Sequence, residues 1–165
     1  MRLLTLVRHA KSSWDYPELS DFERPLNDRG RRDAPRMAEH VQPLLGRPDR
    51  LVTSPASRAI TTARHFADVL RIDERCLSVQ PQIYEATEET LLALVRRLDD
   101  RDLHVMWFGH NPGFTDLAHA LARCPFDDLP TCGVVQIELP VKVWQDVSEQ
   151  CGRVRHHCFP KQLRD

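Results

Sequence analysis

The sequence predicts an α/β protein of three layers, in which helices cover both faces of a mostly parallel central sheet. Short apolar runs, typical of buried strands, alternate along the chain with longer stretches whose apolar residues recur at helical spacing. Strands that are separated by helices pair in parallel, and the connecting helices cover the two faces of the sheet. Ligands of such sheets bind beyond the carboxyl ends of the strands, so functional side chains are expected there.

Apolar runs place the strands. The expected strands are residues 3–7, 51–53, 104–108 and 134–139, and the tail segment 154–159 is a further candidate. The run 3–7 is short, continuous and apolar, which indicates a buried strand. The pattern of residues 134–139 is closer to alternation, which favours an antiparallel or edge position.

Helical spacing and capping signals place the helices between these strands. The expected helices are residues 31–45, about 54–70, 87–98 and 114–122. Gly46 is a stop signal for the first helix, and Thr87 is the expected N-cap of the third. Ser54 and Pro55 are interpreted as the N-cap and first-turn proline of the second helix. The charged run 99–102 is expected to be a solvated loop.

The segment 12–30 is the irregular part of the chain. It contains Pro17, Pro25 and Gly30, several charges and few apolar repeats. A segment of this length without regular structure is usually functional, so we expect it to be the main loop over a binding site.

Composition describes one soluble globular domain, residues 1–165, with 41% hydrophobic and 28% charged residues. The net charge of −1, from 23 basic and 24 acidic residues, gives no electrostatic indication of a nucleic-acid or membrane partner. The N-terminal apolar run is too short for a secretion signal, and no run approaches the roughly 20 residues that span a bilayer. A cytoplasmic location is therefore expected.

The five cysteines are an odd number and show no C-x-x-C spacing. In a reducing compartment we expect free, mostly buried thiols. A zinc site at Cys158 beside His156 and His157 is the alternative, but the paired ligand spacing of such sites is missing. The sequence therefore predicts no metal and no cofactor.

Chemistry-bearing side chains follow three of the expected strands. Arg8 and His9 end the first strand, Arg58 lies in the first turn of the helix after the second, and His110 follows the strand 104–108. We expect these residues to face one crevice, because the carboxyl ends of parallel strands meet at one edge of the sheet.

This combination of side chains suits a phosphoryl group. Guanidinium groups bind phosphate oxygens in a bidentate fork, and a helix N-terminus adds N–H donors. An imidazole that nearby positive charge keeps neutral can attack phosphorus. A second histidine can then stabilise the charge on the transferring oxygens.

Three motifs resemble those of the histidine phosphatase superfamily, whose fold is phosphoglycerate-mutase-like. They are Arg8-His9-Ala10, which resembles R-H-G, then Ser54-Pro55-Ala56-Ser57-Arg58-Ala59, and Gly109-His110-Asn111. Further segments are similar to the small SixA-type phosphohistidine phosphatases and occur in the expected order, namely 8–12, 21–26 with Arg29-Gly30, 84–86, 109–112 and 160–163.

The resemblance implies that His9 is the nucleophile that becomes phosphorylated. It implies that Arg8, Arg58 and His110 form the phosphate pocket, and that Glu85 is the proton donor. Lys11 and Ser12, which follow the first motif, are expected to contribute to substrate binding.

The chain departs from the family pattern at three positions. Ala10 replaces the usual glycine, which a negative φ would tolerate. Lys11 stands where many relatives have an acid, and it adds positive charge near the pocket. Asp15 replaces an asparagine; because a carboxylate cannot donate a hydrogen bond to phosphate, we expect it to turn away, towards Arg24.

The expected function is that of a metal-independent phosphatase with a phosphohistidine intermediate on His9, acting on phosphohistidine in a protein. A chain of this length has little room for a cap over the pocket, and an open pocket suits a protein-borne side chain. Imidazole, with a reference pKa of about 6.5, leaves without a strong proton donor. The alternatives are a phosphomonoesterase for small metabolites or protein phosphoserine, and a non-catalytic phospho-binding module.

Overall fold

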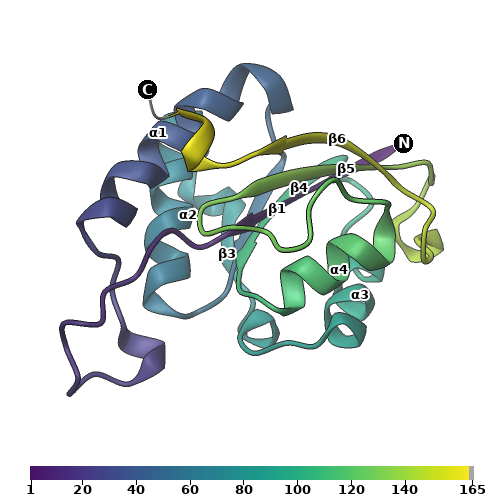
Figure 1. Cartoon of the computed structure of the whole chain (residues 1–165). Coiled ribbons are helices and arrows are strands. Elements are labelled where there is room, and N and C mark those ends of the chain that lie inside the picture. Colours follow the sequence, from purple (N-terminus) through teal and green to yellow (C-terminus); the bar gives the residue numbers. More distant parts are fainter. Residues whose placement is uncertain (164–165) are drawn as a thin grey trace.

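The computed structural model describes residues 1–163, which form a six-stranded sheet between two pairs of helices (Figure 1). The elements in chain order are β1 (Arg2–Arg8), α1 (Asp28–Leu45), β2 (Arg50–Thr53), α2 (Ser57–Leu70), β3 (Leu77–Val79), α3 (Glu88–Arg96), β4 (His104–Gly109), α4 (Gly113–Leu121), β5 (Val134–Leu139) and β6 (Arg153–Cys158).

The strand order is β3-β2-β4-β1-β5-β6. The first four of these strands are mutually parallel, whereas β5 and β6 are antiparallel to their neighbours. The expected mostly parallel sheet is confirmed, and so is the antiparallel pairing of 134–139. The short strand β3 was not predicted, because its three residues carry no periodic pattern.

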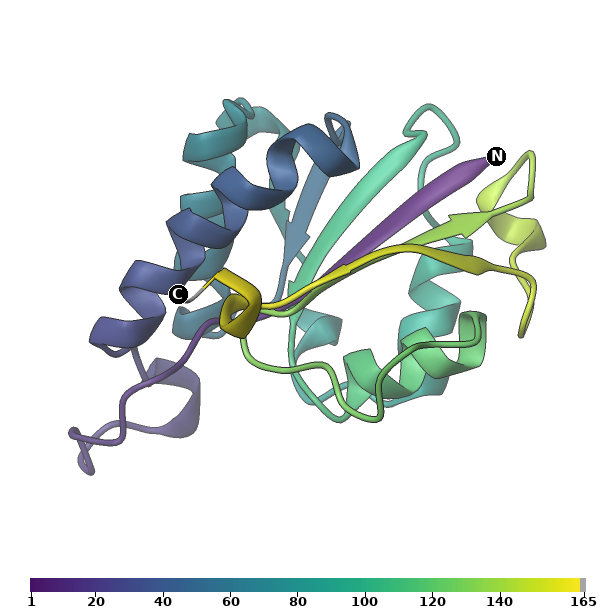
Figure 2. The same ribbon diagram turned by 45° about the horizontal axis from the view of Figure 1, so that its top comes forward.

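The sheet is the middle of three layers. Helices α1 and α2 cover one face and α3 and α4 cover the other (Figures 1 and 2). Alternate residues of β4 serve the two cores: Phe108 packs in the apolar cluster with α1 and α2, and Trp107 in the cluster with α3 and α4. The predicted three-layer sandwich is therefore correct.

Ser54 is not the N-cap that the sequence predicts. Helix α2 begins at Ser57 after Ala56, and no side chain caps it. Ser54 lies in the buried turn before the helix, where its hydroxyl accepts a hydrogen bond from the backbone N–H of Ala56 at 3.2 Å. The serine hydroxyl is therefore available to a side chain of the candidate site.

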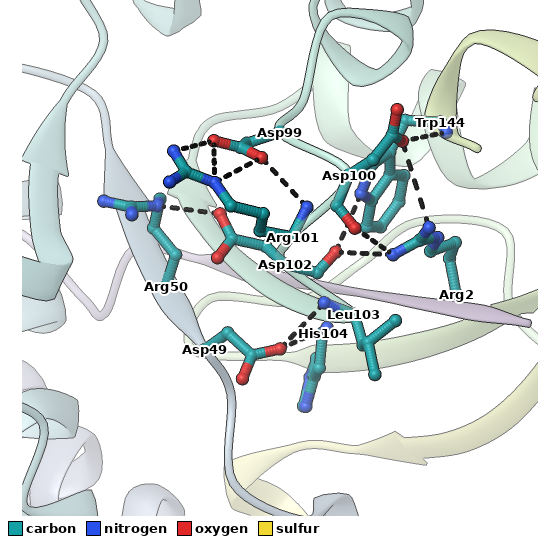
Figure 3. Close-up of polar contacts among 10 residues, drawn as sticks. All are labelled: Arg2, Asp49, Arg50, Asp99, Asp100, Arg101, Asp102, Leu103, His104 and Trp144. Carbon is teal, nitrogen blue, oxygen red and sulfur yellow. Dashed lines mark hydrogen bonds and ion pairs between the residues drawn. The ribbon is translucent and has the colours of Figure 1, made fainter. Parts of the chain in front are cut away.

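The charged run 99–102 is not simply a solvated loop. The carboxylate of Asp102 accepts a hydrogen bond from Arg50 at 2.9 Å, and its carbonyl accepts one from the indole of Trp144 at 2.9 Å (Figure 3). Arg2 donates to the carbonyl of Asp100 at 2.7 Å. These contacts tie the amino ends of β1 and β4 together, at the edge of the sheet away from the strands' carboxyl ends.

A buried polar cluster lies on one face of the sheet. The Nε2 atom of His104 is 2.7 Å from the hydroxyl of Thr5, and the amide of Gln136 donates to that hydroxyl at 3.2 Å and to the carbonyl of Leu45 at 3.0 Å. Burial lowers the pKa of His104 to about 4. The imidazole is therefore neutral in the folded protein at neutral pH.

We predict that the His104 imidazole makes stability depend on pH. The unfolded chain protonates this group near pH 6.5, whereas the folded protein protonates it only near pH 4. The group leaves the free energy of unfolding unchanged above pH 6.5 and lowers it as pH falls towards 4, by on the order of 3 kcal/mol.

Urea unfolding from pH 7.5 to 4.5 measures this loss. His104→Gln, which keeps an acceptor for the Thr5 hydroxyl, should lose part of the slope, whereas His40→Gln at an exposed position should keep it. An unchanged slope in His104→Gln would contradict the assignment.

Candidate active site

The structure brings Arg58 and both motif histidines to the carboxyl end of the sheet. His9 directly follows β1, Arg58 lies in the first turn of α2, and His110 directly follows β4. The ring centroids of the two histidines are 5.3 Å apart, and Arg58 Nε lies 3.4 Å from His9 Nε2. Strand ends and a helix start therefore converge on one small volume.

His9 is held in one tautomer. Its Nδ1 lies 2.7 Å from the carbonyl oxygen of Ala10, which can only accept, so Nδ1 carries the proton. Nε2 is then the atom with the lone pair, which accepts a hydrogen bond from Arg58 Nε at 3.4 Å. Burial lowers the pKa of His9 to about 3, and the charges of His110, Arg58 and Arg8 act in the same direction. The side chain is a neutral imidazole with an available nitrogen at pH 7.

Arg58 is a buried cation that binds the loop over the site. Its Nη1 donates to the carbonyl of Asp21 at 2.7 Å and its Nη2 to the carboxylate of Asp21 at 3.0 Å. The hydroxyl of Tyr84 donates to the same carboxylate at 2.7 Å. Burial, together with this bond to Asp21, raises the pKa of Tyr84 to about 12.

His110 is held by Ser54, the residue that the sequence pattern predicts to be the N-cap of the second helix. Its Nε2 is 2.7 Å from the hydroxyl of Ser54, and its Nδ1 is buried without a hydrogen-bond partner among residues 1–163. Burial lowers the pKa of His110 to about 4, and the charge of Arg58 contributes. His110 therefore has one anchored nitrogen and one buried nitrogen whose hydrogen-bonding capacity is not used by residues 1–163.

Arg8 completes the positive charge around the two histidines. Its Nη1 donates to the carbonyl of Leu129 at 3.1 Å, and its Nε is buried without a partner within the described part of the chain. Leu129 also accepts from the amide of Asn111, so the segment after α4 helps to hold Arg8. Burial lowers the pKa of Arg8, whose guanidinium nevertheless stays charged.

The remaining predicted site residues lie at the rim. Lys11 is exposed, while Ser12 is buried and its hydroxyl accepts a hydrogen bond from Arg24. Glu85 is exposed in a left-handed backbone conformation, with φ of 56°, and it lines a pocket of about 640 Å³ next to His110. The structure therefore places Glu85 near His110, whereas the hydroxyl of Ser12 is already bound by Arg24.

The expectation that Asp15 turns towards Arg24 is wrong. The guanidinium of Arg24 lies over the ring of Trp14 at 3.9 Å and donates to Asp21 at 3.0 Å, while Asp15 is exposed. Arg24 pairs with Asp21 instead, because Asp21 begins a short 3₁₀ turn and Arg24 directly follows that turn.

The loop 12–30 covers the site, and glycine lets it approach closely. A Cβ on Gly30 would lie 2.1 Å from the carbonyl oxygen of Lys11, so only glycine allows α1 to pack against the backbone that follows His9. Ala10 is buried and lies outside the residues of positive φ, so its substitution for glycine adds no backbone strain.

Three further members of the site are not predicted by the sequence motifs: Asp21, Tyr84 and Ser54. All three lie in segments that carry the resemblance, but their roles depend on contacts between distant parts of the chain. A carboxylate in the irregular segment next to a predicted cationic pocket was the one available signal for Asp21.

Two other sequence expectations concern metals and membranes. Among residues 1–163, no group of three or more His, Cys, Asp or Glu side chains could hold a metal ion. All five cysteines are free thiols; Cys132 and Cys158 are buried and the other three partly buried. Within the same range, no helix is long and apolar enough to cross a bilayer.

Comparison with known proteins finds chains that match this one over most of its length. An uncharacterised chloroplastic protein of Arabidopsis thaliana is 29% identical over 159 residues, covering 92% of this chain and 72% of that protein. The solved structure of SixA from Agrobacterium tumefaciens superposes with a TM-score of 0.79 at 24% identity, covering 96% of this chain and 98% of the other.

A second solved structure, the protein histidine phosphatase SixA complexed with tungstate, superposes with a TM-score of 0.83 at 20% identity, covering 98% and 99% of the two chains. These likenesses confirm the phosphoglycerate-mutase-like sandwich that the motifs implied.

The family itself is shown by the sequence. The model of the histidine phosphatase superfamily (branch 1) matches residues 4–107, which is more than half of the chain and includes His9 and Arg58. With this match and the fold in agreement, the chain belongs to the histidine phosphatase superfamily, branch 1.

Proposed function

We propose that this chain is a phosphatase that takes a phosphoryl group onto Nε2 of His9 and acts on phosphohistidine in a protein. Membership of the histidine phosphatase superfamily supports phosphatase activity, and the SixA structures support the phosphohistidine substrate. The observation that carries the proposal is the neutral His9, whose unprotonated Nε2 accepts a hydrogen bond from Arg58 at 3.4 Å beside His110.

In the first step the lone pair of His9 Nε2 forms a bond to phosphorus while the bond to the leaving group breaks. Arg8 and Arg58 hold the equatorial oxygens and neutralise their charge. The buried Nδ1 of His110, which has no partner in residues 1–163, supplies a further hydrogen bond to the phosphoryl group. The electron pair of the broken bond stays on the leaving atom.

In the second step water attacks phosphorus, the bond to His9 Nε2 breaks and inorganic phosphate leaves. Water gives up its proton to solvent, and the nitrogen regains its lone pair. The positive charge that the reaction needs comes from the two arginines, so the scheme requires neither a metal nor a cofactor.

The leaving group distinguishes the candidate substrates. Phosphohistidine releases imidazole, which departs easily, whereas an alkyl ester releases an alkoxide that needs a proton donor. Glu85 lines the pocket beside His110 but has no hydrogen-bond partner within the described residues. A carboxyl group at this position could protonate an alkoxide, which favours a phosphomonoesterase for metabolites or phosphoserine as the second candidate function. A non-catalytic phospho-binding module would need no proton donor.

We predict that the wild-type protein forms an acid-labile phosphoryl adduct on His9. After a brief incubation with a phosphohistidine protein and rapid quenching, mass spectrometry should find the phosphoryl group on His9. His9→Ala should fold normally and give no adduct and no turnover, whereas His40→Ala at an exposed position should behave as wild type. Turnover by His9→Ala, or binding without an adduct in the wild type, would refute a covalent mechanism.

We predict that Glu85→Gln affects substrates according to their leaving groups. If Glu85 donates the proton, kcat/KM for alkyl phosphate esters should fall about 10²-fold or more, because a general acid contributes 10²–10⁴-fold. Phosphohistidine should be affected far less. Steady-state kinetics with both substrates measures this, and Glu89→Gln on the same pocket wall is the matched control. An equal loss on both substrates would mean that Glu85 is not a proton donor.

A further inference from the structure

Asp21 places a carboxylate directly on the cation that is proposed to bind phosphate. One of its oxygens accepts from Arg58 at 3.0 Å and from Tyr84 at 2.7 Å, and the other accepts from Arg24 at 3.0 Å. The backbone carbonyl of Asp21 binds Arg58 as well. Both terminal nitrogens of Arg58 therefore donate to Asp21, and its Nε faces His9.

The segment around Asp21 is fixed by more than this ion pair. The ring of Phe22 packs edge-on against that of Tyr84, with centroids 5.3 Å apart, and Tyr84 packs against His110 at 5.5 Å. Asp21 is thus connected to both sides of the pocket, through Arg58 towards His9 and through Tyr84 towards His110.

The carboxyl group of Asp21 is ionised near neutral pH. Burial alone would raise the pKa of its carboxyl, but hydrogen bonds from Tyr84, Arg24 and Arg58 hold that pKa well below its ordinary value. The group cannot donate a proton to a leaving group near neutral pH. It can only accept hydrogen bonds and exert a negative charge.

The carboxylate still has capacity for a ligand. Its two oxygens offer about four acceptor positions, of which three are taken. The side chain is 49% exposed, so a ligand that binds at Arg58 can reach it from solvent. A fixed negative charge at this position attracts a cationic leaving group and repels one that develops negative charge.

We propose that Asp21 is a specificity-determining residue, which favours phosphorylated imidazole and disfavours phosphate esters of alcohols. This inference rests on the proposed function, because it assigns a substrate preference to the same pocket. Asp21 discriminates between leaving groups by its charge, and it competes with the phosphoryl group of either substrate for Arg58.

The chemistry of the two leaving groups explains the preference. A phosphohistidine ring that has taken a proton from solvent on its second nitrogen is cationic and presents an N–H to Asp21. When its P–N bond breaks, the electron pair stays on the leaving nitrogen and a neutral imidazole departs. An ester builds negative charge on its leaving oxygen, next to a carboxylate that repels it.

The test uses Asp21→Asn with two peptides of one sequence, carrying either phosphohistidine or phosphoserine. Asparagine keeps an acceptor for Tyr84 and Arg58 but removes the charge. The ratio of kcat/KM for phosphohistidine over phosphoserine should fall about tenfold or more, with the phosphoserine value unchanged or raised. Asp15→Asn, an exposed acid of the same loop, should keep the wild-type ratio.

Equal changes for both peptides would overturn the inference, since they would mean that Asp21 only holds Arg58 in place. An unchanged ratio would overturn it too. Wild-type protein that cleaves neither peptide would refute the proposed function instead.

Orthovanadate binding tests the competition at Arg58 without turnover. Asp21→Asn should bind vanadate several-fold more tightly than the wild type and than Asp15→Asn. Equal affinity would overturn the inference even if phosphatase activity is confirmed.

Discussion

The parallel pairing of β1 with β4 is the constraint on which the site depends. The ladder continues past the strands, because the backbone N–H of His9 donates to the carbonyl of Gly109 at 3.0 Å. Arg8 is in register with Gly109, so the next residues of the two segments, His9 and His110, lie side by side. The parallel neighbour β2 then leads through a short turn to α2, whose first turn carries Arg58. Backbone hydrogen bonds between parallel strands therefore bring three segments that are far apart in the sequence to one point.

Placing two imidazoles and two guanidiniums in a buried site has an electrostatic cost, which the fold offsets in two ways. Burial and like charge keep the imidazoles of His9 and His110 neutral, so only the arginines carry charge there. Asp21 then neutralises Arg58 when no phosphate is bound. The Asp21 carboxylate thus has two effects: it neutralises Arg58 in the free protein, and it influences which substrate the pocket accepts. Substrate specificity and stability are therefore coupled at one residue.

Much of the fold follows from patterns that are local in sequence. The runs 3–7 and 104–108 are continuous and apolar, as strands covered on both faces must be, and the motifs at their ends place Arg8, His9 and His110. The remaining features depend on contacts that no local pattern encodes. Ser54 is an ordinary N-cap in sequence but turns to His110, and Asp21 is an ordinary loop acid until α2 presents Arg58 to it. The strand β3 is too short to show periodicity and is defined by its pairing with β2.

One phosphoryl group is proposed to bind between His9, Arg8, Arg58 and His110. A crystal structure of this protein with tungstate tests it most directly, because the oxyanion imitates the transferring group. We expect the tungsten atom to lie next to His9 Nε2, with the tungstate oxygens bound by both arginines and by His110. A tungstate bound away from His9, or a structure with Arg58 on the opposite face of the sheet, would contradict it.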